Sequence, residues 1–116
     1  MGDAREVMDE LRAPTREPRT AAPHARAGFA RLHDAAIADG VLSRRVKELM
    51  TLVIAVVRRC GGWITVHAKT VAVRGATPGE AAETLSVALL MDGGAGTVCR
   101  PRAWAAYQEL VPSQPA

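Results

Sequence analysis

The sequence predicts an all-α protein folded as a compact helical bundle, and three features favour this class. Apolar residues recur at helical spacing along most of the chain, and no alternating strand pattern of useful length appears. Apolar residues make up 48% of the chain but aromatic residues only 3%, so Ala, Val and Leu form a core suited to close helix packing. At 116 residues the chain is one small domain, and its limited core favours association with further copies.

The N-terminal part divides into a short helix and a proline-rich arm. Residues 1–12 carry apolar residues on one helical side, whereas residues 13–23 contain three prolines and are predicted to be extended. We therefore expect three parts: an N-terminal helix and arm over 1–23, a helical domain over 24–110 and a tail over 111–116.

Within the helical domain, glycines and caps separate the predicted helices. Gly40 and Gly75 are suited to ending a helix, and Ser43 is suited to capping the start of one. Thr77-Pro78-Gly79-Glu80 combines a cap, a proline in the first turn and a capping-box glutamate. The predicted helices cover 24–39, 44–59, 63–73, 78–92 and 97–110.

The helix that follows Ser43 is apolar on two faces. Val46, Met50 and Val53 belong to one stripe, while Leu49 and Leu52 belong to another. A helix of this kind is expected to be buried on both faces, either centrally or against another subunit.

Charge and composition exclude several classes of function. The net charge of +3 comes from 13 Arg and 2 Lys against 12 acids, a usage typical of high-GC bacterial genomes. The arginines are spread among acids and prolines, so we expect no nucleic-acid surface. The apolar run at 49–57 is too short for a membrane span, which needs about 20 residues. With no leader pattern and only two cysteines, we expect a cytoplasmic protein without a disulfide framework.

The chain is organised around residues 48–67, which hold the candidate site. Cys60 stands at the glycine-marked entrance of a helix, where unpaired N–H groups and nearby arginines stabilise a thiolate. The alternative is a small buried apolar residue. His67 lies two helical turns further on the same face, with Trp63 between them, and is either functional or a structural histidine.

Glu48 is the remaining candidate in this stretch, because it lies among apolar neighbours. If the two central helices form an antiparallel hairpin that turns near Cys60, Glu48 and His67 come to similar depth. A buried carboxylate needs a partner, and His67 is the expected one. Such a pair either relays a proton or forms a structural hydrogen bond.

The spacing Glu48-x11-Cys60-x2-Trp63-x3-His67, followed by a helix, a glycine, the Thr77 cap and a Met-x-Gly-Gly segment, resembles the carboxymuconolactone decarboxylase-like superfamily, which includes alkyl hydroperoxidase D. The likeness covers about 27–110. It implies a helical bundle around a central antiparallel hairpin, assembled as a homotrimer or homohexamer.

In the peroxidase branch of that superfamily, Glu and His relay protons while the second cysteine of Cys-x-x-Cys attacks the peroxide and the first resolves it. The resemblance assigns Glu48, Cys60 and His67 to this set. Trp63 occupies the place of the attacking cysteine, so the usual disulfide cycle cannot run there. The indole either plugs the cavity or forms a stacking wall for a planar ligand.

Three functions remain open. The leading expectation is a weakened or altered thiol-dependent peroxidase, a peroxiredoxin-type antioxidant oxidoreductase in which Cys60 acts alone. An external thiol or Cys99 would then resolve it. The second is a lyase that decarboxylates a carboxylated lactone or similar small acid, using His67 and Glu48 with an arginine for the carboxylate. The third is a catalytically degenerate oligomeric binding module. We expect no metal and no cofactor in any of them.

Overall fold

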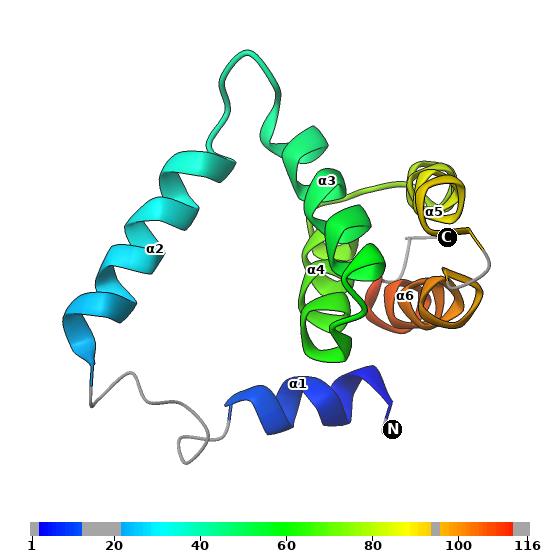
Figure 1. The fold of residues 1–116 in the computed structure, drawn as a ribbon, viewed down its shortest axis with the longest axis horizontal. Helices are drawn as coiled ribbons and strands as arrows, with labels where there is room; N and C mark the ends of the chain where they lie inside the picture. The colour runs from blue at the N-terminus through cyan, green and yellow to red at the C-terminus, as the bar shows by residue number, and fades with distance from the viewer. Residues whose placement is uncertain (1–2, 13–21, 94–95, 113–116) are drawn as a thin grey trace.

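The computed structural model describes residues 3–12, 22–93 and 96–112, and within these ranges every regular element is a helix (Figure 1). The predicted all-α class is therefore confirmed. The predicted extended arm and the C-terminal tail fall almost entirely outside the described residues. The six helices are α1 (Ala4–Arg12), α2 (Pro23–Ile37), α3 (Arg44–Val57), α4 (Gly61–Val73), α5 (Pro78–Asp92) and α6 (Gly96–Leu110).

Helices α3 and α4 form a hairpin at the centre of the molecule, with α5 and α6 packed along one side of it (Figure 1). Leu52 and Val56 of α3 are fully buried against a core that includes Ile64 and Ala68 of α4. The abundance of Ala in this core lets the helices approach closely. The hairpin therefore sets the positions of Glu48, Cys60 and His67 relative to one another.

The hairpin begins at a local cap, and its turn is also held by an ion pair to the end of α5. The Ser43 hydroxyl accepts a hydrogen bond from the Val46 N–H at 3.2 Å, as the predicted cap requires. At the turn, Arg59 adopts a positive φ of 56° and its guanidinium pairs with Asp92 at 2.9 Å. Helix α4 starts at Gly61, two residues earlier than predicted, because the Cys60 carbonyl already accepts from the Ile64 N–H at 2.8 Å.

Helix α1 is docked onto the bundle. The backbone N–H of Ala4 donates to the Glu109 carboxylate at 2.9 Å, and the Arg5 guanidinium pairs with the same carboxylate at 3.0 Å. These contacts join the N-terminal helix to α6, and the helix also packs on α4. Leu11 lies close enough to Gly62 that a Cβ there would stand 3.6 Å from its side chain.

Helix α2 stands apart from the other helices, joined to α3 by a short bend (Figure 1). Its buried residue is Ile37, whereas Phe29 is 50% exposed and Leu32 is 64% exposed. The facing stripe of α3, including Met50 and Ile54, is also about half exposed. The expectation that α3 is buried on both faces is therefore not met within a single chain. No helix among the described residues is long and apolar enough to cross a membrane.

Candidate functional site

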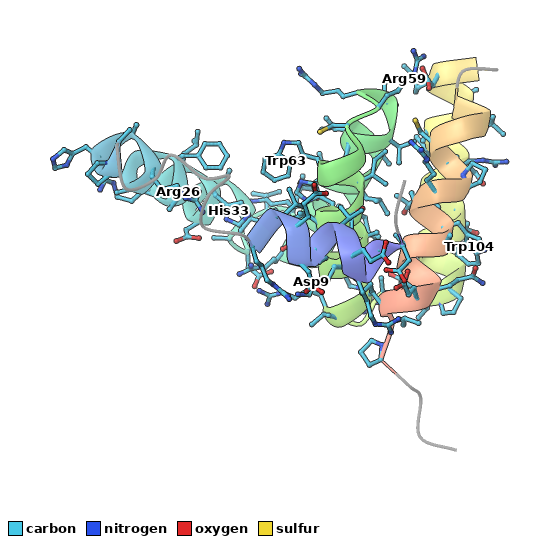
Figure 2. All side chains as sticks on the ribbon, turned by 90° about the horizontal axis from the view of Figure 1, so that it is seen from below. Asp9, Arg26, His33, Arg59, Trp63 and Trp104 are labelled. Carbon is cyan, nitrogen blue, oxygen red and sulfur yellow. The ribbon has the colours of Figure 1, made fainter. Side chains whose placement is uncertain are left out.

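A groove lies between the projecting α2 and the α3–α4 hairpin, with a cavity volume of about 740 Å³. Apolar side chains form most of its walls, and a few polar groups converge on it, which is typical of ligand sites. Figure 2 shows the Trp63 ring on the side of the hairpin that faces α2, with His33 on α2 across from it. Five of the lining residues could bind a ligand or take part in a reaction: His33, Arg58, Cys60, Trp63 and His67.

Cys60 is the N-cap residue of α4 and is exposed to solvent in the groove. Its extended backbone (φ −92°, ψ 103°) lets its carbonyl accept the first hydrogen bond of the helix. The thiol therefore stands at the positive end of a 13-residue helix, on the same cavity wall as Arg58. A helix N-terminus and a nearby arginine are surroundings in which reactive cysteines are found. The alternative of a buried apolar cysteine does not hold for Cys60.

Trp63 and His67 stack on each other one turn apart on α4. Their ring centroids are 5.3 Å apart and their planes meet at 16°. The indole is 48% exposed, and the cavity beside it stays open. The indole therefore lines this cavity without filling it. The stacking also fixes the orientation of the imidazole toward the groove.

His67 is partly withdrawn from water, and its Nδ1 atom has no hydrogen-bond partner among the described residues. Burial lowers the pKa of His67, while the Glu48 carboxylate raises it and His33 lowers it further. Because burial dominates, the imidazole is neutral at pH 7. A neutral imidazole with an unengaged buried nitrogen can accept or relay a proton from a group in the groove.

Glu48 is buried on α3, with 3% of its surface exposed, and its partner differs from the expected one. The Arg44 guanidinium, one turn earlier on the same helix, donates to its carboxylate at 3.2 Å. The charge of this carboxylate raises the pKa of His67, but no hydrogen bond or ion pair joins the two side chains in the described part of the chain. Arg44 is closer in sequence and always charged, so it satisfies the buried acid locally.

Similarity to known proteins agrees with this arrangement of residues. The sequence matches the carboxymuconolactone decarboxylase family over residues 23–109. The chain belongs to this family. An uncharacterised protein of Cupriavidus necator is 32% identical over 90 residues, which cover 78% of this chain and 80% of that protein. The resemblance expected from the sequence is confirmed.

A solved member of the carboxymuconolactone decarboxylase family has the same fold. The crystal structure of an apo family protein from Legionella pneumophila superposes with a TM-score of 0.88 at 30% identity. The match covers 94% of this chain and 97% of that chain. The structural similarity therefore extends beyond the α3–α4 hairpin to nearly the whole of both chains.

The second cysteine of this family member lies away from the groove. Cys99 is buried in the core on α6, whereas Cys60 is exposed, and both thiols are free. The structure thus brings Cys60, Trp63 and His67 together on one cavity and leaves Cys99 outside that lining.

Sequence reasoning missed two polar residues of the site. His33 lines the groove from α2, and its position four residues after Phe29, which also lines it, was the available signal. Arg44 lies four residues before Glu48, the spacing of a helical ion pair. The spacing of Arg44 and Glu48 was sufficient to suggest their ion pair. The spacing of Phe29 and His33 does not place His33 at the site, because the position of α2 relative to the hairpin is a tertiary feature.

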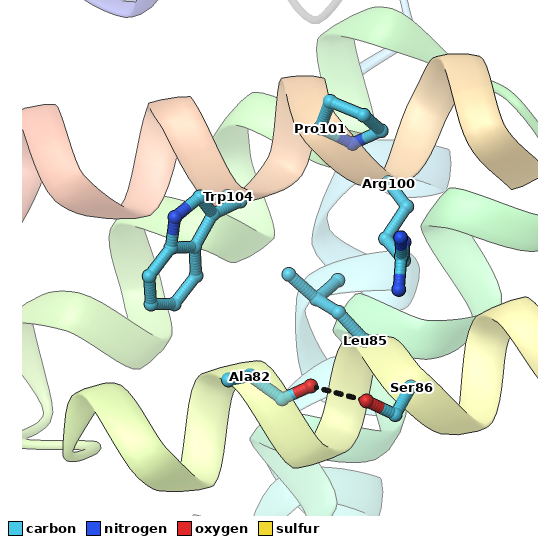
Figure 3. A pocket seen from close by; sticks show the side chains of 6 residues that line it. All are labelled: Ala82, Leu85, Ser86, Arg100, Pro101 and Trp104. Carbon is cyan, nitrogen blue, oxygen red and sulfur yellow. Dashed lines mark hydrogen bonds between the residues drawn. The ribbon is translucent and has the colours of Figure 1, made fainter.

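A separate hollow between α5 and α6 has a volume of about 320 Å³ and a different character (Figure 3). Trp104, Pro101 and Leu85 form its apolar lining, and Arg100 is the charged residue among the described ones that line it. The Ser86 hydroxyl donates within α5 to the Ala82 carbonyl at 3.0 Å. None of the described residues that line this hollow is a His, Cys, Asp, Glu or Lys. Among the described residues, no group of three or more His, Cys, Asp and Glu side chains is placed to hold a metal.

Proposed function

We propose that this family member is a thiol-dependent peroxidase in which Cys60 alone reacts with the peroxide. The observation that carries the proposal is the exposed Cys60 thiol at the start of α4, on one cavity wall with a neutral His67. Reactive cysteines are found at helix N-termini, and a base lining the same cavity can take the thiol proton through water. Glu48 contributes to proton transfer indirectly, because its negative charge raises the pKa of His67.

The proposed reaction has two stages. His67 removes the thiol proton through water in the groove, and the Cys60 sulfur attacks the terminal peroxide oxygen. The O–O bond breaks, sulfur becomes sulfenic acid, and the departing alkoxide takes the proton back to leave as an alcohol. An external thiol then condenses with the sulfenic acid and releases water. A second thiol molecule restores the Cys60 thiol and leaves as a disulfide.

An external thiol is part of the proposal because Trp63 replaces the cysteine that would otherwise form an internal pair with Cys60. The buried position of Cys99 argues against an internal resolving step. Turnover should therefore depend on the concentration of added small thiol, and it should be slower than that of a protein with an adjacent dithiol.

The test is to expose the protein to hydrogen peroxide and to an alkyl hydroperoxide across pH and to record intact mass. We expect an added oxygen on Cys60 that small thiols reverse, loss of this reaction in Cys60→Ser, and retention in the matched variant Cys99→Ser. A Cys60 that stays unmodified at neutral pH would contradict the proposal.

A second candidate is a lyase acting on a carboxylated lactone or similar small acid. The open groove lined by Trp63 and His67 favours it, because a planar ligand packed on the indole would lie beside the imidazole. The bond to the carboxylate would break, CO2 would leave, and the carbon would take a proton relayed by His67. Arg58 is the arginine available in the groove for a carboxylate.

These candidates respond differently to substitution. Lyase activity, measured as CO2 release from a carboxylated γ-lactone, should survive Cys60→Ser and disappear in His67→Ala. A degenerate binding module, the third candidate, should show neither reaction in the wild-type protein. Substitution of Glu48 would then change stability alone.

We also propose that the protein associates with itself as a homotrimer or homohexamer and works in the cytoplasm. The exposed apolar faces of α2 and α3 support self-association, because both border the groove and the described residues of the chain leave both uncovered. A partner copy seated there would enclose the candidate site.

A further inference from the structure

A second cavity lies at the open end of the α3–α4 hairpin, away from the turn that carries Cys60. Its volume is about 340 Å³, and side chains from α1, α2, α3 and α4 line it. Arg44 from the first turn of α3 and Arg74 from the end of α4 stand at its rim, and Lys69 reaches it from the middle of α4. His33 is the residue that this cavity shares with the Cys60 groove.

The charge of this cavity is unbalanced. Three cationic side chains, Arg44, Lys69 and Arg74, line it together with one carboxylate, that of buried Glu48. Arg44 pairs with Glu48 at 3.2 Å. The Lys69 ammonium and the Arg74 guanidinium form no hydrogen bond or ion pair with any residue that the structure describes. These two side chains therefore line the cavity without a counter-charge among the described residues.

The remaining lining defines what kind of anion fits. Met8, Val66 and Val73 supply apolar walls around the cations. The Thr70 hydroxyl is engaged with the Val66 carbonyl at 3.0 Å and offers no additional donor. Cations beside apolar walls suit an organic anion with one charged group and an apolar body better than a fully polar ion. The volume lies at the lower end of the range for small-molecule pockets.

We propose that this cavity is a second ligand site, which binds a small organic carboxylate through Lys69 and Arg74. Arginine can hold both carboxylate oxygens at once, and the lysine adds a second charge. The apolar body of the ligand packs on Met8 and Val73. The site lies beyond the proposed peroxidase function, because neither Lys69 nor Arg74 lines the Cys60 groove.

The test uses the full chain and benzoate as the probe, with binding followed by NMR titration or calorimetry. We expect saturable benzoate binding and at least tenfold weaker binding of benzamide, its neutral counterpart. Lys69→Ala/Arg74→Ala should weaken benzoate binding tenfold or more, because charge-assisted contacts are lost. Arg31→Ala, which removes an exposed cation of α2, should leave it unchanged.

Several outcomes would overturn the assignment. In one, benzoate binds the double variant as tightly as the wild type; in another, benzamide binds as tightly as benzoate. Tighter binding of inorganic phosphate than of benzoate would also contradict it. Cys60→Ser should bind benzoate as the wild type does, since the sites are separate. The double variant should still react with peroxide, so failure of one proposal is distinguishable from failure of the other. Lys69 and Arg74 lie outside the core, and circular dichroism checks that the double variant folds.

Discussion

The Trp63 ring lies flat against His67 and leaves the groove beside it open. This single residue changes the chemistry available to the site, because an indole can neither attack a peroxide nor form a disulfide. It also shields one face of the imidazole from water. The proposed peroxidase therefore depends on Cys60 and an external thiol, while the stacked pair offers a planar surface to a ligand.

The protonation of His67 gives a prediction at the same scale. Burial lowers its pKa below the ordinary value of about 6.5. Between the lowered pKa of the folded protein and about 6.5, the unfolded chain binds more protons than the folded one. We therefore expect the free energy of unfolding to fall as the pH drops through about 6.5. Urea unfolding at pH 7.5 and 5.5 measures this difference, which should shrink in His67→Gln.

The matched control is His24→Gln, which alters an exposed histidine of α2 and should leave the pH dependence as it is. NMR titration of the imidazole signals provides a direct check on the sign. A His67 midpoint above 6.5 would show that the attraction of Glu48 outweighs burial, and the predicted pH dependence of stability would then be reversed.

At the scale of the elements, α5 illustrates how local interactions fix a helix. The Thr77 hydroxyl accepts from the Glu80 N–H at 3.1 Å, and the Glu80 carboxylate accepts from the Thr77 N–H at 3.1 Å. These backbone and side-chain bonds, with the Arg45 guanidinium, lower the pKa of Glu80. Arg45 belongs to α3, so the capping box also ties the start of α5 to the central hairpin.

Removing this cap has a predictable cost. Thr77→Ala leaves the Glu80 N–H without its acceptor and should lower the free energy of unfolding by about 1 kcal/mol. Ser86→Ala removes a hydroxyl from the same helix without touching its end, and its effect should stay within about 0.5 kcal/mol. Urea unfolding of both variants makes the comparison. Equal effects would mean that the capping box contributes nothing specific.

At the scale of the whole molecule, the position of α2 raises the question of what covers its apolar face. Phe29 and Leu32 on α2 and Ile54 on α3 are each at least half exposed. A monomer with this surface is prone to associate. We expect light scattering coupled to size exclusion to give a trimer or hexamer for the wild type.

Ile54→Asp should shift that assembly toward the monomer, because it places a charge in the proposed interface. Ser86→Asp adds the same charge to an exposed position of α5 and should leave the assembly intact. A wild-type protein that stays monomeric at all concentrations tested would contradict self-association. In that case the apolar face of α2 would either pack against another part of the same chain or remain exposed to solvent.

The sequence by itself determined the helical class, the ends of most helices and the family, because these depend on local periodicity, on caps such as Ser43 and Thr77, and on spacing along α3 and α4. It also identified Cys60, Trp63 and His67 as neighbours, since residues on one face of one helix share their surroundings. Only the tertiary structure decided that α2 projects and adds His33 to the groove. It likewise decided that the groove beside Trp63 is open and that Lys69 and Arg74 face a second cavity. These features depend on contacts between helices, which local patterns do not encode. The Arg44–Glu48 ion pair, by contrast, lies within one helix at a spacing that the sequence already contains.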